Sequence, residues 1–89
     1  MLWLSDMYNR CVHFLERNGW SANVEPGPSE YLSLEKDECI AVDINKKEIV
    51  LLDDTGDFLH LPVNYYALVG ALFEYRQIPA NYSPTPYSR

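Results

Sequence analysis

Residues Asn64–Ile78, NYYALVGALFEYRQI, carry no charge between Tyr65 and Phe73, and their pattern predicts one helix. At about 100° per residue, the bulky side chains fill about half of the helix circumference. They are Tyr65, Tyr66, Leu68, Val69, Leu72, Phe73 and Tyr75. An apolar arc of that width needs a core to cover it. We therefore expect its central residues to be buried, namely Leu68, Val69, Leu72 and Phe73.

A second helix is predicted near the N-terminus, over Leu4–Leu15, because its apolar residues share one arc and its polar residues the other. Asn18 and Gly19 should end this helix, since glycine takes the left-handed conformation that closes a helix. Trp20 is expected to fold back onto the core. Residues Ser21–Glu25 can form a short extended piece.

Four strand-length segments lie between the two helices, and turn-forming residues separate them. They are Glu30–Leu34, Cys39–Ile44, Glu48–Leu52 and Asp57–Leu61. The predicted fold class is therefore α+β: a helix, a four-stranded antiparallel β-meander and a second helix, with both helices on one face of the sheet. We expect a single domain over residues 1–79, followed by a flexible tail over 80–89 that contains proline and tyrosine.

The alternation of side chains along the strands assigns residues to the two faces of this sheet. If Ile40, Val42, Ile44, Ile49 and Leu51 face the helices, the residues between them face the other way. That second face then carries Val50, Leu52 and Phe58 beside Ala41 and Asp43. Three large apolar side chains on an uncovered face are typical of a protein-binding surface.

The formal charge of −6 opposes direct binding to nucleic acid or to an anionic membrane surface. Acidic residues gather between Glu25 and Asp57, so a basic partner should meet this middle section. Its carboxylates nearest to the apolar patch are Asp43, Asp53, Asp54 and Asp57. Two interpretations stay open: these carboxylates imitate a nucleic acid in front of a nucleic-acid-binding protein, or they only keep a tyrosine-rich protein in solution.

The chain offers little material for catalysis or metal binding, with only two histidines and two cysteines. Their spacing matches no metal site, and no glycine-rich loop is present to hold a nucleotide, so we expect no cofactor and no metal. Cys39 and His60 could form a thiol-dependent pair only if two strands aligned them, and no oxyanion element accompanies them. We therefore predict that the protein is not an enzyme.

The two cysteines do not have the spacing of a disulfide scaffold and fit free thiols in a reducing compartment. We find no basic leader and no long apolar run, so we expect a cytoplasmic protein without a membrane span. The predicted function is a small acidic protein-binding module that inhibits or regulates another protein, in the manner of phage or plasmid inhibitors. The alternative is a self-associating structural subunit, a homodimer without an inhibitory role.

Overall fold

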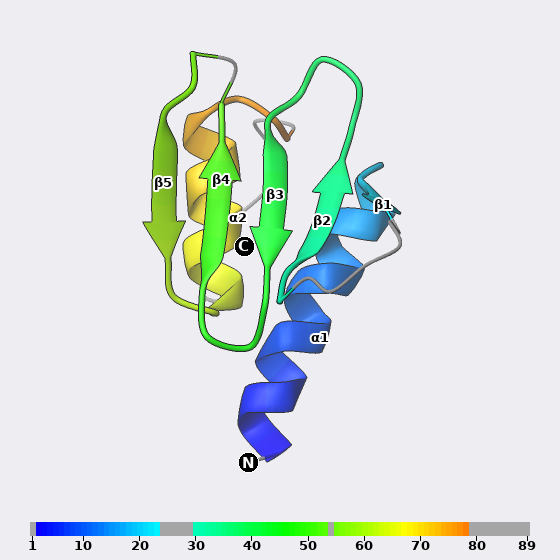
Figure 1. Cartoon of the computed structure of the whole chain (residues 1–89). Coiled ribbons are helices and arrows are strands. Elements are labelled where there is room, and N and C mark those ends of the chain that lie inside the picture. The colour runs from blue at the N-terminus through cyan, green and yellow to red at the C-terminus, as the bar shows by residue number, and fades with distance from the viewer. Residues whose placement is uncertain (1, 24–29, 54, 79–89) are drawn as a thin grey trace.

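The computed structural model describes residues 2–23, 30–53 and 55–78, and it has the expected α+β architecture (Figure 1). Two helices and five strands follow one another within these described residues. They are α1 (Leu2–Arg17), β1 (Ser21–Asn23), β2 (Leu32–Glu35), β3 (Ala41–Ile44), β4 (Ile49–Leu52), β5 (Phe58–Leu61) and α2 (Tyr65–Glu74). The predicted tail over 80–89 lies outside the described residues. Neither of the described helices is both long enough and apolar enough to cross a membrane.

The sheet has five strands rather than the predicted four. All neighbouring strands are antiparallel and follow the order β1-β2-β3-β4-β5, which is a simple meander. The additional strand, β1, occupies the first part of the extended piece expected at Ser21–Glu25, and its Ala22 pairs with Leu34. With only three residues, β1 is too short for alternation to distinguish it from a loop, and pairing with β2 defines it.

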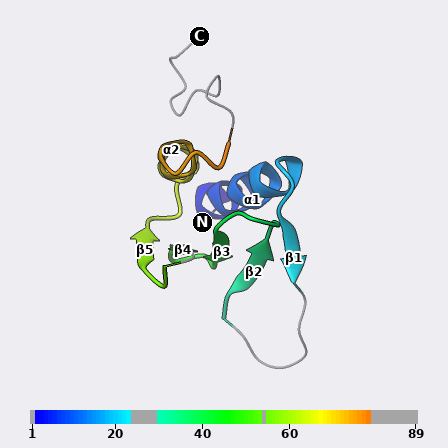
Figure 2. The ribbon, with the colours of Figure 1, turned by 90° about the horizontal axis from the view of Figure 1, so that it is seen from above.

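Both helices lie on the same side of the sheet, as Figure 2 shows from above. The core forms between these helices and the sheet. From α1 it takes Cys11, Phe14 and Leu15, from the strands Leu34, Val42, Ile44, Ile49 and Leu51, and from α2 Leu68, Val69 and Leu72; Trp20, Ile40 and Ile78 complete it. Phe73, which we expected in the core, is half-buried and packs against its edge.

Both helices end in the same hydrogen-bonded motif, in which one residue takes a left-handed conformation. At the end of α1 this residue is Gly19, with φ of 102°, and the Trp20 N–H donates to the Leu15 carbonyl over 2.9 Å. This confirms the predicted stop, and Trp20 is only 1% exposed. At the end of α2 the left-handed residue is Arg76, with φ of 60°. The helix therefore ends at Glu74, before the predicted Ile78.

The segments that follow the two helices meet at the backbone of Ile40, just before β3. The Trp20 indole N–H donates to the Ile40 carbonyl over 2.9 Å, and the Ile40 N–H donates to the Gln77 side-chain oxygen over 2.9 Å. Ile40 has no strand partner of its own, so these two side chains satisfy both of its backbone groups. The contact connects both helices to the central strand β3.

Candidate protein-binding surface

The sheet face that points away from both helices is the candidate site, and we call it the outer face. Strand register places on it Ser33 and Glu35 of β2, Ala41 and Asp43 of β3, Val50 and Leu52 of β4, and Phe58 and His60 of β5. Their neighbours Ile40, Val42, Ile44, Ile49 and Leu51 are all in the core. The predicted assignment of faces is therefore confirmed. Among the described residues, no helix or strand covers the outer face (Figure 2).

The apolar part of the outer face is centred on Phe58, whose side chain is 62% exposed. Leu52 lies directly opposite Phe58 on β4 and is half-buried. Val50 differs from the prediction, because it is only 8% exposed although it does not belong to the core. Asp43 and His60 flank it on the neighbouring strands and shield it. The accessible patch therefore consists of Phe58 and Leu52.

A hydrogen-bonded cluster that the sequence analysis missed lies at one end of the outer face. Glu48, just before β4, accepts from the Tyr31 hydroxyl and lies 3.0 Å from Nδ1 of His60. Hydrogen bonds from Tyr31 and from His60 lower the pKa of the Glu48 carboxyl, and the bond to Glu48 raises the pKa of Tyr31. Tyr31 and Glu48 lie in the predicted segments Glu30–Leu34 and Glu48–Leu52, and alternation along these segments would have placed both on this face.

The predicted acidic residues have different environments. Asp43 is half-buried and accepts a 2.5 Å hydrogen bond from the Ser33 hydroxyl. Asp57 is exposed just before β5. Asp54 lies outside the described residues. Asp53 is the residue that organises the turn between β4 and β5.

One carboxylate oxygen of Asp53 accepts three hydrogen bonds: 3.0 Å from the Thr55 N–H, 2.7 Å from the Thr55 hydroxyl and 3.0 Å from the Asp57 N–H. The Thr55 hydroxyl and the Asp57 N–H are the main causes that lower the pKa of Asp53. Gly56 is left-handed, with φ of 92°, and its N–H donates to the Asp53 carbonyl. Strands β4 and β5, neighbours in the predicted meander, are therefore joined by a hairpin turn that contains a left-handed glycine.

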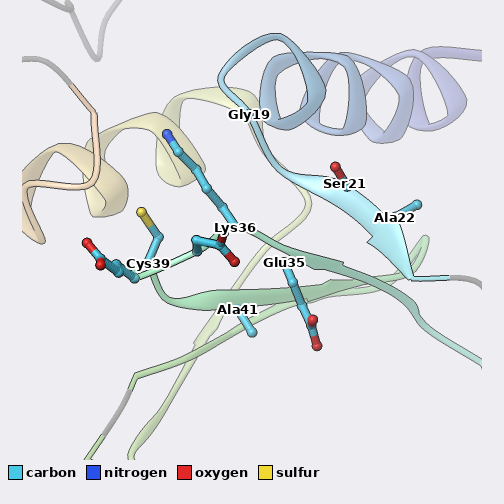
Figure 3. A pocket seen from close by; sticks show the side chains of 9 residues that line it. Gly19, Ser21, Ala22, Glu35, Lys36, Cys39 and Ala41 are labelled. Atoms are coloured by element: carbon cyan, nitrogen blue, oxygen red, sulfur yellow. The ribbon is translucent and has the colours of Figure 1, made fainter.

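The charged side chains that the strands place on or beside the outer face are carboxylates. Strands β2 to β5 contain no lysine or arginine, while Glu35 and Asp43 project from the outer face and Glu48 adjoins it. In Figure 3, Glu35 and Ala41 point to the side of the sheet away from α1. A partner that covers Phe58 and Leu52 therefore meets carboxylates around them.

A pocket of about 610 Å³ lies elsewhere, beside the turn between β2 and β3 (Figure 3). The Lys36 side chain crosses it. Its ammonium donates to the Asn18 carbonyl at the end of α1 over 2.6 Å and lies 4.6 Å from the centre of the Trp20 ring. These contacts stabilise the end of α1, because a cation there interacts favourably with the helix dipole.

The thiols and histidines do not come together. Register aligns His60 with Val50 and Asp43, whereas Cys39 lies in the turn before β3, four residues from Asp43 in the sequence. Cys11 is buried, and burial raises the pKa of its thiol to about 11. In the part of the chain that the structure describes, no three His, Cys, Asp or Glu residues are grouped so that they could hold a metal ion.

Comparison of the chain with protein-family models, with curated proteins and with solved structures finds no match.

Proposed function

We propose that this chain is a small, acidic, non-enzymatic module that binds another protein through its outer face. The observation that carries the proposal is Phe58, a large aromatic side chain that is 62% exposed beside Leu52 on a sheet face. Aromatic residues are enriched at the centres of protein interfaces and among the residues that contribute most binding energy there.

The charge of the surface defines the class of partner. Carboxylates around an apolar centre favour a basic protein, because opposite charges speed association and exclude wrong partners. The proposed partner is a nucleic-acid-binding protein whose basic site the module occupies, in the manner of a phage or plasmid inhibitor. We include Val50, Leu52, Phe58, Asp43, Asp53, Asp54 and Asp57 in the proposed contact region.

Internal hydrogen bonds bear on how far the carboxylates imitate a nucleic acid. Asp43 is bonded to Ser33 and Asp53 to its own turn, whereas Asp57 is exposed. A mimic needs carboxylates held in place with free oxygens, and the bonds leave the second oxygen of Asp43 and of Asp53 available. The cytoplasm is the compartment we propose, because Cys11 and Cys39 are both free thiols.

The first experiment is a comparison of captured proteins. The wild-type chain and a Phe58→Ser variant are immobilised and exposed to an extract of the native host, and bound proteins are identified by mass spectrometry. A matched control is Tyr75→Ser, which removes another exposed aromatic residue, 39% exposed, that follows α2. We expect a protein retained by wild type and by Tyr75→Ser but lost with Phe58→Ser. Equal retention by all three chains would contradict the proposal.

The second experiment tests mimicry on the partner so identified. A short duplex DNA is added to the purified complex, and the dissociation constant is measured at several salt concentrations. If the module occupies a nucleic-acid site, DNA competes with it and the complex weakens as salt increases. If neither DNA nor salt changes the dissociation constant of the complex, the outer face is still a binding surface, but the proposal that it imitates a nucleic acid is wrong.

A further inference from the structure

Strand β5 forms an edge of the sheet that lacks the usual protection. Edge strands generally avoid pairing with other chains because they carry charged residues, proline or a bulge, or because they are very short. The residues of β5 are Phe58, Leu59, His60 and Leu61, without a lysine, an acid or a proline. Three of the four are exposed. The opposite edge, β1, has only three residues and includes Ser21 and Asn23.

No described element lies beyond β5. The strand is outermost in both views of the ribbon, and α2 lies over β4 and β5 rather than outside them (Figures 1 and 2). Leu59 is only partly covered as a result: it lies on the helix side of the sheet, opposite the buried Leu51, yet it is 38% exposed. The edge can therefore accept another strand.

The register identifies which backbone groups face outward. The Asp53 N–H donates to the Asp57 carbonyl, so this pair is hydrogen-bonded. Bonded and non-bonded pairs alternate in an antiparallel ladder, so Leu51 with Leu59 and Ile49 with Leu61 are the next bonded pairs. The N–H and carbonyl groups of Phe58 and His60 consequently point away from β4, toward the open edge.

We propose that β5 pairs with β5 of a second copy of this chain, which makes one continuous ten-stranded sheet. Only one antiparallel register uses both free residues on each copy: Phe58 opposite His60 of the second copy, and His60 opposite its Phe58. Leu59 then lies directly opposite Leu59 of the second copy, at a position where side chains approach closely. The two-fold axis passes between these leucines, perpendicular to the sheet.

The formal charge of −6 on each chain does not prevent pairing with a second copy through β5. The paired strands themselves are uncharged. In this register Asp57 lies opposite Leu61, so the two copies of Asp57 are about four residues apart along the strand, or roughly 13 Å. That separation exceeds the Debye length of about 8 Å at physiological salt, so their repulsion is largely screened.

The register also fixes the arrangement of the two copies. Residues that are opposite in an antiparallel pair share a face, so both outer faces lie on the same side and the four helices on the other. Phe58 of each copy packs beside His60 of the other, which extends the exposed apolar patch across the two-fold axis. This inference stands on the strand edge and does not depend on the proposed foreign partner.

A charge exchange at position 59 tests the register. We expect the wild-type chain to approach twice its mass of 10.3 kDa in sedimentation equilibrium as its concentration rises. Leu59→Lys and Leu59→Glu should each remain monomeric, because like charges then face each other. An equimolar mixture of the two variants should restore a dimer. Monomers in the mixture, or wild type that stays monomeric at every concentration, would overturn the proposal.

A second measurement avoids variants altogether. In a monomer, the amide protons of Phe58 and His60 face solvent and exchange rapidly, whereas those of Leu59 and Leu61 bond to β4 and are protected. Pairing should slow exchange at Phe58 and His60 as protein concentration increases, with little change at Leu59 and Leu61. Unchanged exchange at Phe58 and His60 while the mass doubles would show a dimer through another surface and overturn the proposal.

Salt separates this inference from the proposed function. Self-association joins two chains of the same negative sign and should strengthen as salt increases, whereas binding to a basic partner should weaken. A dimer that weakens with salt would contradict edge pairing. The capture experiment with Phe58→Ser tests binding to the foreign partner, and the mixture of Leu59→Lys with Leu59→Glu tests the dimer. The two results are independent, so either proposal can fail alone.

Discussion

A single side chain, Gln77, joins the C-terminal end of α2 to the sheet. Its oxygen accepts the Ile40 N–H over 2.9 Å, at a backbone position where no neighbouring strand supplies a partner. Removing an acceptor from a partly buried donor costs about 1–3 kcal/mol, because the donor is left without a hydrogen bond.

We therefore predict that Gln77→Ala lowers the free energy of unfolding by about 1–3 kcal/mol in urea titrations. Gln77→Glu is the matched control, since it keeps an oxygen in the same place, and it should cost less. If both variants were as stable as the wild type, water would satisfy Ile40 equally well and the contact would have no structural role.

The two left-handed residues that end the helices should respond in opposite ways to substitution. Arg76 has φ of 60°, which a side chain disfavours, whereas Gly19 has φ of 102° without that cost. Arg76→Gly should increase the free energy of unfolding by about 0.5–1 kcal/mol, and Gly19→Ala should decrease it by about 1–2 kcal/mol. Thermal unfolding measures both. A destabilised Arg76→Gly variant would mean that the Arg76 side chain makes a stabilising contact larger than its backbone strain.

The carboxylate of Asp53 contributes to the hairpin of β4 and β5 through its hydrogen bonds within the turn. Hydrogen bonds from Thr55 and Asp57 lower the pKa of this carboxyl below the ordinary value of 3.8. Its stabilising contribution is therefore present above the unfolded pKa and is lost as the pH falls through the lower folded pKa.

We predict that Asp53 titrates below pH 3.8 in a carboxyl NMR titration of the folded protein. The stability difference between the wild type and Asp53→Asn should change only under acidic conditions, because the amide oxygen accepts hydrogen bonds at every pH. A carboxyl that titrates at or above its ordinary value would show that the turn does not hold the carboxylate as described.

At the scale of the whole molecule, one core connects the two helices with three strands, β2, β3 and β4, and no described helix or strand covers the other side of the sheet. Leu72 of α2 is fully buried in that core. Leu72→Ala should lower the free energy of unfolding by about 2–5 kcal/mol, from lost burial and from the cavity left behind. Tyr75→Ala, at an exposed position three residues further on, should change it little. A loss below about 1 kcal/mol for Leu72→Ala would contradict this core.

The sequence by itself determined the α+β class, the two helices, four of the strands and the assignment of residues to the two faces. These features follow from local periodicity, since apolar side chains recur with the period of a helix or a strand wherever one side is buried. The stop at Gly19 was also predictable, because the left-handed conformation strongly favours glycine. The alternation of side chains also predicted that Phe58 lies on the surface, and it is exposed there.

The tertiary structure alone decided what depends on neighbours distant in sequence. Strand β1 exists because β2 pairs with it, and α2 ends at Glu74 through backbone hydrogen bonds that no residue preference indicates. Val50 is shielded by side chains from two other strands, and the cluster of Tyr31, Glu48 and His60 joins three separate segments. Alternation gives the face on which a side chain lies, but its exposure depends on lateral neighbours, and only strand pairing brings these together.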